Sequence, residues 1–111
     1  MSQRPAYKVE WHDSAVADLR DLYTIDPRMP RIAVEAAGDL AEHHKHGKEL
    51  GQRNVSGDLS GYFRLCFDVP GQRPQRYRMI YSRPAADVIR ILAVGKREGS
   101  AIYRLAVKRL R

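Results

Sequence analysis

The 111-residue chain has little cysteine, tryptophan or phenylalanine and no long apolar run: one Cys, Cys66, one Trp and two Phe. A single cysteine excludes an internal disulfide framework and fits a reducing compartment. The absence of 18 consecutive apolar residues argues against a transmembrane helix, and the opening residues lack the apolar segment of a secretory signal. We therefore expect a cytoplasmic protein with a single domain over residues 1–111 and no membrane association.

Acidic residues are scarce in the second half of the chain. Residues 1–50 hold 7 basic and 9 acidic side chains, whereas residues 51–111 hold 13 basic and 4 acidic ones. Arginine supplies 15 of the 20 cations, and its planar guanidinium binds phosphate through two parallel hydrogen bonds. This asymmetry favours a face that binds a polyanion, either a nucleic acid or an acidic protein segment, over a uniformly basic surface.

The spacing of apolar residues predicts an α+β domain. The expected elements are a strand at 7–11, a short helix capped by Asp13 or Ser14, a helix at about 31–46 stopped by Gly47, strands at 62–67, 76–81 and 87–94, and a helix at 101–110. The order β-α-α-β-β-β-α predicts a small antiparallel sheet with two N-terminal helices and one C-terminal helix packed on it.

Several arginines fall where this fold brings them together. Arg76 and Arg78 are two apart on a predicted strand, so they share a face. Arg64 on the neighbouring strand joins them if the register permits, and Arg97 follows the last strand. We expect these guanidinium groups to converge on the concave side of the sheet, although any one of them alone is more typical of a solvated strand face.

The C-terminal third carries a specific motif. Residues 95–103, GKREGSAIY, with 106–110, AVKRL, resemble the ending of the RelE branch of the RelE/ParE toxin superfamily. Residues 77–81, YRMIY, resemble a strand of that family, and residues 57–65, GDLSGYFRL, resemble the segment before it. The expected order of elements matches along nearly the whole chain.

The resemblance implies the toxin of a type II toxin-antitoxin system, an mRNA interferase. Such a ribosome-dependent endoribonuclease cuts messenger RNA in the A site by attack of the 2′-hydroxyl, with no metal and no cofactor. Aligned position by position, the catalytic residues are Arg64, Arg78, Arg97 and Tyr103. The expected RNA contacts are Arg76, Lys96, Lys108 and Arg109. The implied partners are the ribosome, messenger RNA and an antitoxin whose acidic or amphipathic segment covers the cationic cleft.

One departure from the family leaves the proton transfers open. Cys66 stands where the second of two family lysines is expected. Arginines stabilise a charged phosphorane but are poor proton donors, and Tyr103 serves as a base only if neighbouring cations lower its pKa. Two alternatives therefore remain: a ParE-like, non-enzymatic inhibitor of DNA gyrase, and a catalytically weakened homologue that only binds its antitoxin. The GKRE run followed by Tyr103 favours the RelE reading.

Four other features have simpler structural interpretations. The histidines of residues 43–46, HHKH, are more typical of a solvated helix end than of a metal site, because adjacent helical positions diverge by about 100°. Cys66 is expected to be a small buried residue and Trp11 a core residue. Glu98 is expected to pair with neighbouring arginines rather than to act as an acid or base.

Overall fold

A five-stranded sheet organises the computed structural model, which describes residues 5–53 and 57–110. Its strand order is β1-β7-β6-β5-β2, for β1 (Lys8–Trp11), β2 (Lys48–Glu49), β5 (Tyr62–Phe67), β6 (Tyr77–Ala85) and β7 (Val88–Lys96). The strands expected at 62–67, 76–81 and 87–94 are confirmed with small shifts at their ends. The expected all-antiparallel sheet is wrong in one respect, because β1 pairs with β7 in parallel. Two further strands, β3 (Gln52–Arg53) and β4 (Gly57–Asp58), form a separate pair.

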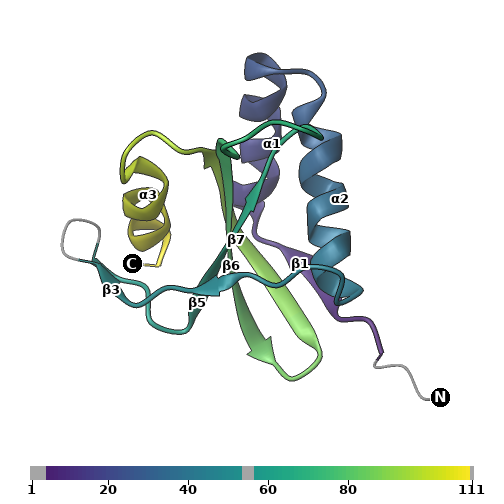
Figure 1. Cartoon of the computed structure of the whole chain (residues 1–111). Coiled ribbons are helices and arrows are strands. Elements are labelled where there is room, and N and C mark those ends of the chain that lie inside the picture. The colour runs from purple at the N-terminus through teal and green to yellow at the C-terminus, as the bar shows by residue number, and fades with distance from the viewer. Residues whose placement is uncertain (1–4, 54–56, 111) are drawn as a thin grey trace.

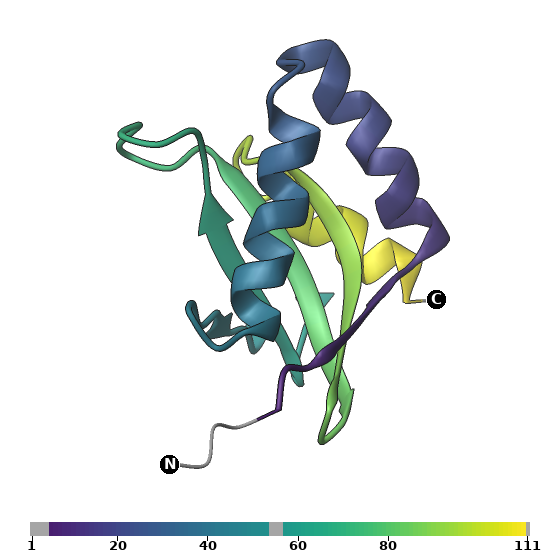
Figure 2. The ribbon, with the colours of Figure 1, turned by 90° about the vertical axis from the view of Figure 1, so that its right-hand side faces the viewer.

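The helices cover both faces of the sheet. Helices α1 (Asp13–Ile25) and α2 (Met29–Ala41) lie on one face, and α3 (Ala101–Arg109) lies on the other (Figures 1 and 2). None of the three, over the residues described, is long and apolar enough to cross a bilayer. The fold class expected from the sequence, α+β with two N-terminal helices and one C-terminal helix, is confirmed.

Two helix boundaries differ from the expected ones. The N-cap of α1 is His12, whose Nδ1 accepts a hydrogen bond from the Ser14 amide at 3.2 Å, rather than Asp13 or Ser14. Helix α2 ends at Ala41 instead of at about residue 46, so Gly47 is not its C-terminal stop. The physical reason is that residues 42–46, EHHKH, are all polar and offer no apolar face to continue the stripe that buries Leu40.

The core has two parts, one on each face of the sheet. Met79 and Tyr81 on β6 pack with the α1–α2 side, whereas Ile80 between them packs with α3, as strand alternation requires. The β6–β7 register shifts after Ile80, which pairs with Ala93. This irregularity lets Leu92 and Ala93 both join the α3-side core, although they are consecutive.

An ion pair anchors α3 to α1. Strand β1 pairs with β7 only as far as Ile91, and beyond it the Val94 amide donates to Oδ2 of Asp18 on α1 at 2.9 Å. The same carboxylate accepts two hydrogen bonds from Arg109 on α3, at 2.7 and 2.8 Å. Both side chains are largely buried, at 7% and 16% exposed. The last turn of α3 is thereby held against α1 and β7, where Arg109 also donates to the Leu92 carbonyl oxygen at 3.0 Å.

Candidate functional site

The four residues expected to be catalytic line one pocket. Its volume is about 480 Å³, and it lies on the α3 side of the sheet. Strands β2, β5 and β6, the end of β7 and the start of α3 all contribute to its walls. The lining residues are Lys48, Glu49, Leu50, Arg64, Arg78, Arg97 and Tyr103. We refer to these seven residues as the cationic pocket.

Arg78 is the most buried cation of the cationic pocket. It sits in the middle of the sheet, paired with Cys66 on β5 and Gly95 on β7, and is 8% exposed. Its Nη1 donates to the carbonyl oxygens of Gln75 and Tyr77, both at 2.9 Å, while its buried Nε has no hydrogen-bond partner among the residues described. Within residues 5–53 and 57–110, no carboxylate forms an ion pair with the Arg78 guanidinium. A buried guanidinium with unmet donors is a strong site for an anion.

The β5 wall combines Arg64 with a neighbouring lysine. Lys48 on β2 is the register partner of Arg64, and Arg64 Nη1 lies 3.9 Å from Cys66 Sγ. Cys66 thus shares the face of Arg64, at the position where the family resemblance expects a lysine. An ammonium group is nevertheless available beside it, because Lys48 enters the pocket from the edge strand.

Arg97, in the connection after β7, and Tyr103, on α3, complete the walls of the cationic pocket. The Arg97 amide donates to the Arg76 carbonyl oxygen at 2.7 Å, which continues the β6–β7 pairing beyond its end, and the Arg97 side chain is exposed. Gly99 has φ +58, a left-handed conformation that glycine adopts without strain. The chain turns there so that Tyr103, 2% exposed, faces the pocket from α3.

Sequence reasoning missed Lys48 and Glu49. Strand β2 is two residues long, too short for alternation to reveal it. Glu49 is the only acidic residue that lines the cationic pocket within the described chain, but its register partner Phe63 packs on the α2 face, so strand alternation directs its carboxylate away from the pocket. The one signal in the sequence is its position as an isolated acid between the acidic N-terminal half and the cationic second half.

The four expected RNA contacts do not gather at the cationic pocket. Arg76 precedes β6, so it does not share a strand face with Arg78; it pairs instead with Asp68, at 2.8 and 2.9 Å. Its hydrogen bonds lower the pKa of Asp68 to about 2. Arg109 is held by Asp18 in the interior. Lys96 borders a different hollow beside α1, and Lys108 is exposed on α3.

The histidine segment, Glu98 and Trp11 lie away from the cationic pocket. The His43 ring contacts the Tyr7 ring at 4.7 Å, and His44 lies 3.8 Å from Asp39. Residues 5–53 and 57–110 contain no group of three or more His, Cys, Asp or Glu side chains able to hold a metal ion. Trp11 packs against the core, and Glu98 borders the hollow beside α1.

Comparison with known proteins identifies the family. A family model described as the ParE toxin of the type II toxin-antitoxin system parDE matches residues 9–100. The structure is similar to a chain of the toxin–antitoxin complex RelBE2 from Mycobacterium tuberculosis, with TM-score 0.61 and 30% identity over 87% of this chain and 98% of that one. It also shares its fold with a double arginine-to-alanine variant of the Escherichia coli toxin RelE in the free state, with TM-score 0.53 and 24% identity over 96% and 99% of the two chains. A search of curated protein sequences finds no match. The matched region, the fold and the shared residues together show that this chain belongs to the RelE/ParE superfamily and is a toxin of a type II toxin-antitoxin system.

Proposed function

We propose that this toxin is a ribosome-dependent endoribonuclease that cleaves messenger RNA in the A site of the cytoplasmic ribosome. The observation that supports the proposal is the convergence of Arg64, Arg78, Arg97 and Tyr103 on one pocket from separate elements. The same four residues are indicated by the family motifs of the sequence. Solvated arginines on unrelated strand faces would not be expected to share a cavity with a buried tyrosine.

The residues of the cationic pocket suit metal-independent RNA cleavage. The 2′-oxygen of the substrate forms a bond to the adjacent phosphorus while the bond from phosphorus to the 5′-oxygen breaks, which yields a 2′,3′-cyclic phosphate and a 5′-hydroxyl. Arg78, whose guanidinium is already fixed by two carbonyl oxygens, stabilises the charge that develops on the phosphorane, assisted by Arg64 and Arg97. Their preorganisation matters because a cation that need not move at the transition state costs no reorganisation there.

Lys48 on β2, whose register partner is Arg64, supplies the proton that arginines donate poorly. Lys48 donates a proton to the departing 5′-oxygen, and the proton of the 2′-hydroxyl passes to solvent water. Tyr103 forms the α3 wall; with 2% of its surface exposed it offers little ring area for stacking on a base. Lys48 in this way replaces the ammonium that Cys66 cannot provide.

The proposed protein partner is an antitoxin. A similar structure comes from a toxin–antitoxin complex, and a cationic pocket is readily covered by an acidic or amphipathic segment that orders on binding. The excess of cations in residues 51–111 also fits contacts with RNA phosphates of the ribosome, which would make binding sensitive to salt.

A second candidate function is inhibition of DNA gyrase without catalysis. The observation that favours it is the match to the ParE toxin family model over residues 9–100. On this reading the cationic pocket serves only to bind the antitoxin, as it also would in a catalytically weakened homologue. Fold alone does not separate these functions, because activity is carried by the site.

Mapping of messenger RNA ends in a purified translation system, with and without ribosomes, tests the proposal. We expect cuts at A-site codons only with ribosomes, and their loss in Arg97→Ala. Arg104→Ala is the matched control, because Arg104 is exposed on α3 and lines none of the pockets described. Intact messenger RNA at high protein concentration would overturn the proposal, and a gyrase cleavage assay would then separate an inhibitor from an inactive antitoxin-binding protein.

A further inference from the structure

Two further hollows extend in series from the cationic pocket, the first adjoining it and the second adjoining the first. One of about 330 Å³ shares Lys48 and Arg64 with it. Another, of about 140 Å³, shares Lys45 and His46 with the 330 Å³ hollow. Because β2 is the edge strand of the sheet, the three hollows pass around that edge from the α3 face to the α2 face. We call the two hollows beyond the cationic pocket the edge track.

The edge track is cationic along its length. Lys45, Lys48 and Arg64 line its first hollow, and Arg83 lies in the second. No aspartate or glutamate of the described chain lines either hollow. Lys45 has a loose surface pair with Asp39 at 3.6 Å, which water and salt screen readily. A series of cations without interleaved acids suits a ligand that carries negative charge at regular intervals.

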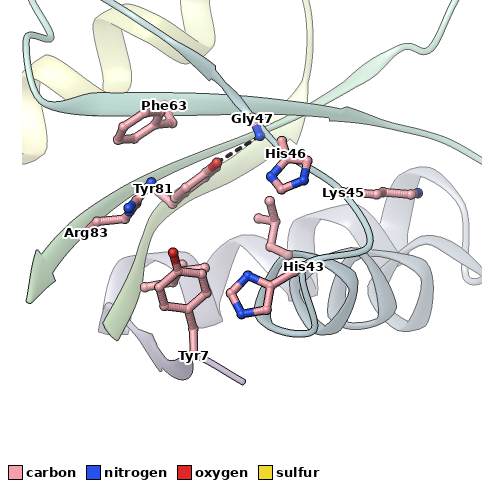
Figure 3. A pocket seen from close by; sticks show the side chains of 10 residues that line it. Tyr7, His43, Lys45, His46, Gly47, Phe63, Tyr81 and Arg83 are labelled. Carbon is pink, nitrogen blue, oxygen red and sulfur yellow. Dashed lines mark hydrogen bonds between the residues drawn. The ribbon is translucent and has the colours of Figure 1, made fainter. Parts of the chain in front are cut away.

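The final hollow is aromatic as well as cationic. The rings of Phe63 and Tyr81 stack at 5.3 Å, and the guanidinium carbon of Arg83 lies 5.7 Å from the centre of the Phe63 ring and 5.5 Å from that of Tyr7. Figure 3 shows Tyr81 pointing to the Gly47 amide, which donates to its hydroxyl at 3.0 Å, with Tyr7 and His43 to one side and Phe63 to the other. The walls are therefore fixed before any ligand arrives.

The size of this hollow limits what enters it. A volume of about 140 Å³ is below the roughly 300–1,000 Å³ of sites for complete small ligands. It accommodates one ring or one phosphate, so the rest of the ligand must lie elsewhere. The rest of the ligand would lie in the neighbouring hollow of the edge track, which is continuous with this one.

We propose that the edge track binds a single RNA strand that continues out of the cationic pocket, with its phosphates on Lys45, Lys48 and Arg64 and one terminal group in the Tyr7–Phe63–Arg83 hollow. The proposal rests on the proposed function for the strand in the cationic pocket. Cations that follow a backbone, ending at aromatic rings, are the combination by which proteins hold single strands without reading sequence. An acidic peptide would use the cations but would not need the rings.

Fluorescence anisotropy with RNA oligomers of 3 and 10 nucleotides, without ribosomes, tests the edge track. The longer oligomer should bind the wild-type toxin at least 10-fold more tightly than the shorter one. Arg83→Gln and Lys45→Gln should each remove most of that gain, and each lost phosphate contact should reduce the slope of log K against log salt by about 0.7. Tyr7→Leu should weaken the longer oligomer by about 5- to 150-fold. Arg20→Gln is the charge-matched control, because Arg20 is exposed on α1 and lines neither hollow.

Each outcome of these experiments either supports or overturns the edge track. Equal binding of both oligomers, or equal effects of Arg83→Gln and Arg20→Gln, would overturn the edge track. Weaker binding of a poly-glutamate peptide by Arg83→Gln, with RNA binding unchanged, would also overturn it and point to a protein ligand. Sedimentation with ribosomes stripped of messenger RNA distinguishes ribosomal RNA from messenger RNA as the strand. Loss of A-site cleavage with length-dependent binding intact would contradict the proposed function and leave the edge track standing.

Discussion

Asp68 and Arg76 form a two-pronged ion pair beside the candidate site, with Nε–Oδ2 and Nη2–Oδ1 distances of 2.8 and 2.9 Å. The Asp68 side chain is wholly buried and also accepts the Val69 and Arg76 amides. The carbonyl oxygen of Arg76 in turn accepts the Arg97 amide at 2.7 Å. The buried carboxylate of Asp68, which lies outside the cationic pocket, therefore positions the backbone of Arg97, one of the arginines that line the pocket.

The Asp68–Arg76 pair predicts a pH-dependent stability. The pKa of Asp68 is lowered from its ordinary 3.8 to about 2, chiefly by the hydrogen bonds from the Arg76 side chain. A lowered pKa stabilises the folded state above pH about 4, by about 2 kcal/mol, and this contribution is lost as the pH falls toward 2. Asp68→Asn should therefore lower the free energy of unfolding at pH 7 by about 2 kcal/mol. Urea unfolding between pH 5 and 2.5 checks this, and a gap between the two proteins that does not narrow would contradict it.

The Asp18–Arg109 pair predicts that Arg109 acts on stability before it acts on any RNA. Removing one partner of a buried ion pair leaves the other charge uncompensated, so Asp18→Asn and Arg109→Gln should each destabilise the fold by about 3 kcal/mol. The double variant should lose less unfolding free energy than the two single variants lose in sum. Chemical denaturation measures all three, with exposed Arg104→Gln as a control expected to change stability by at most about 0.5 kcal/mol. Additive losses would argue against a coupled pair.

The assignment of proton transfer to β2 predicts a specific kinetic signature. Lys48→Met should slow single-turnover cleavage on the ribosome by about 10²- to 10⁴-fold at saturating toxin, whereas Glu49→Gln, whose side chain lies on the other face of β2, should leave the rate largely unchanged. Glu98→Gln, outside the cationic pocket, is the matched control. Cleavage by Lys48→Met at the wild-type rate would show that another group donates the proton.

Gly47 permits a close approach between the chain and β5. A Cβ atom there would collide with the Tyr81 hydroxyl and lie 2.7 Å from the Arg64 carbonyl oxygen. Gly47→Ala should therefore cost about 1–3 kcal/mol, whereas Gly38→Ala, in open space inside α2, should stabilise the protein by about 0.5–1 kcal/mol. Thermal denaturation compares the two. Tolerance of alanine at residue 47 would mean that β2 and the edge track shift easily.

The sequence predicts the parts of this fold that local patterns encode. The long strands and α1 follow from alternation and helical spacing, and Arg78, Arg97 and Tyr103 follow from the family motif. Three features have no local pattern in the sequence: the parallel pairing of β1, the short strand β2, and the ion pairs that hold Arg76 and Arg109. Asp18 and Arg109 are 91 residues apart, so nothing near Arg109 indicates that its charge is already engaged.

The pairing of β1 with β7 has a consequence for the timing of synthesis. The sheet cannot close until residues 88–91 are available to meet residues 8–11, and α3, with Tyr103, is added only after them. Such long-range closure makes folding a late event, because the entropy of a loop spanning most of the chain opposes it until the partner strand exists. The pocket that contains Tyr103 is therefore complete only when nearly all of the chain has been translated, which leaves an antitoxin time to bind the new toxin.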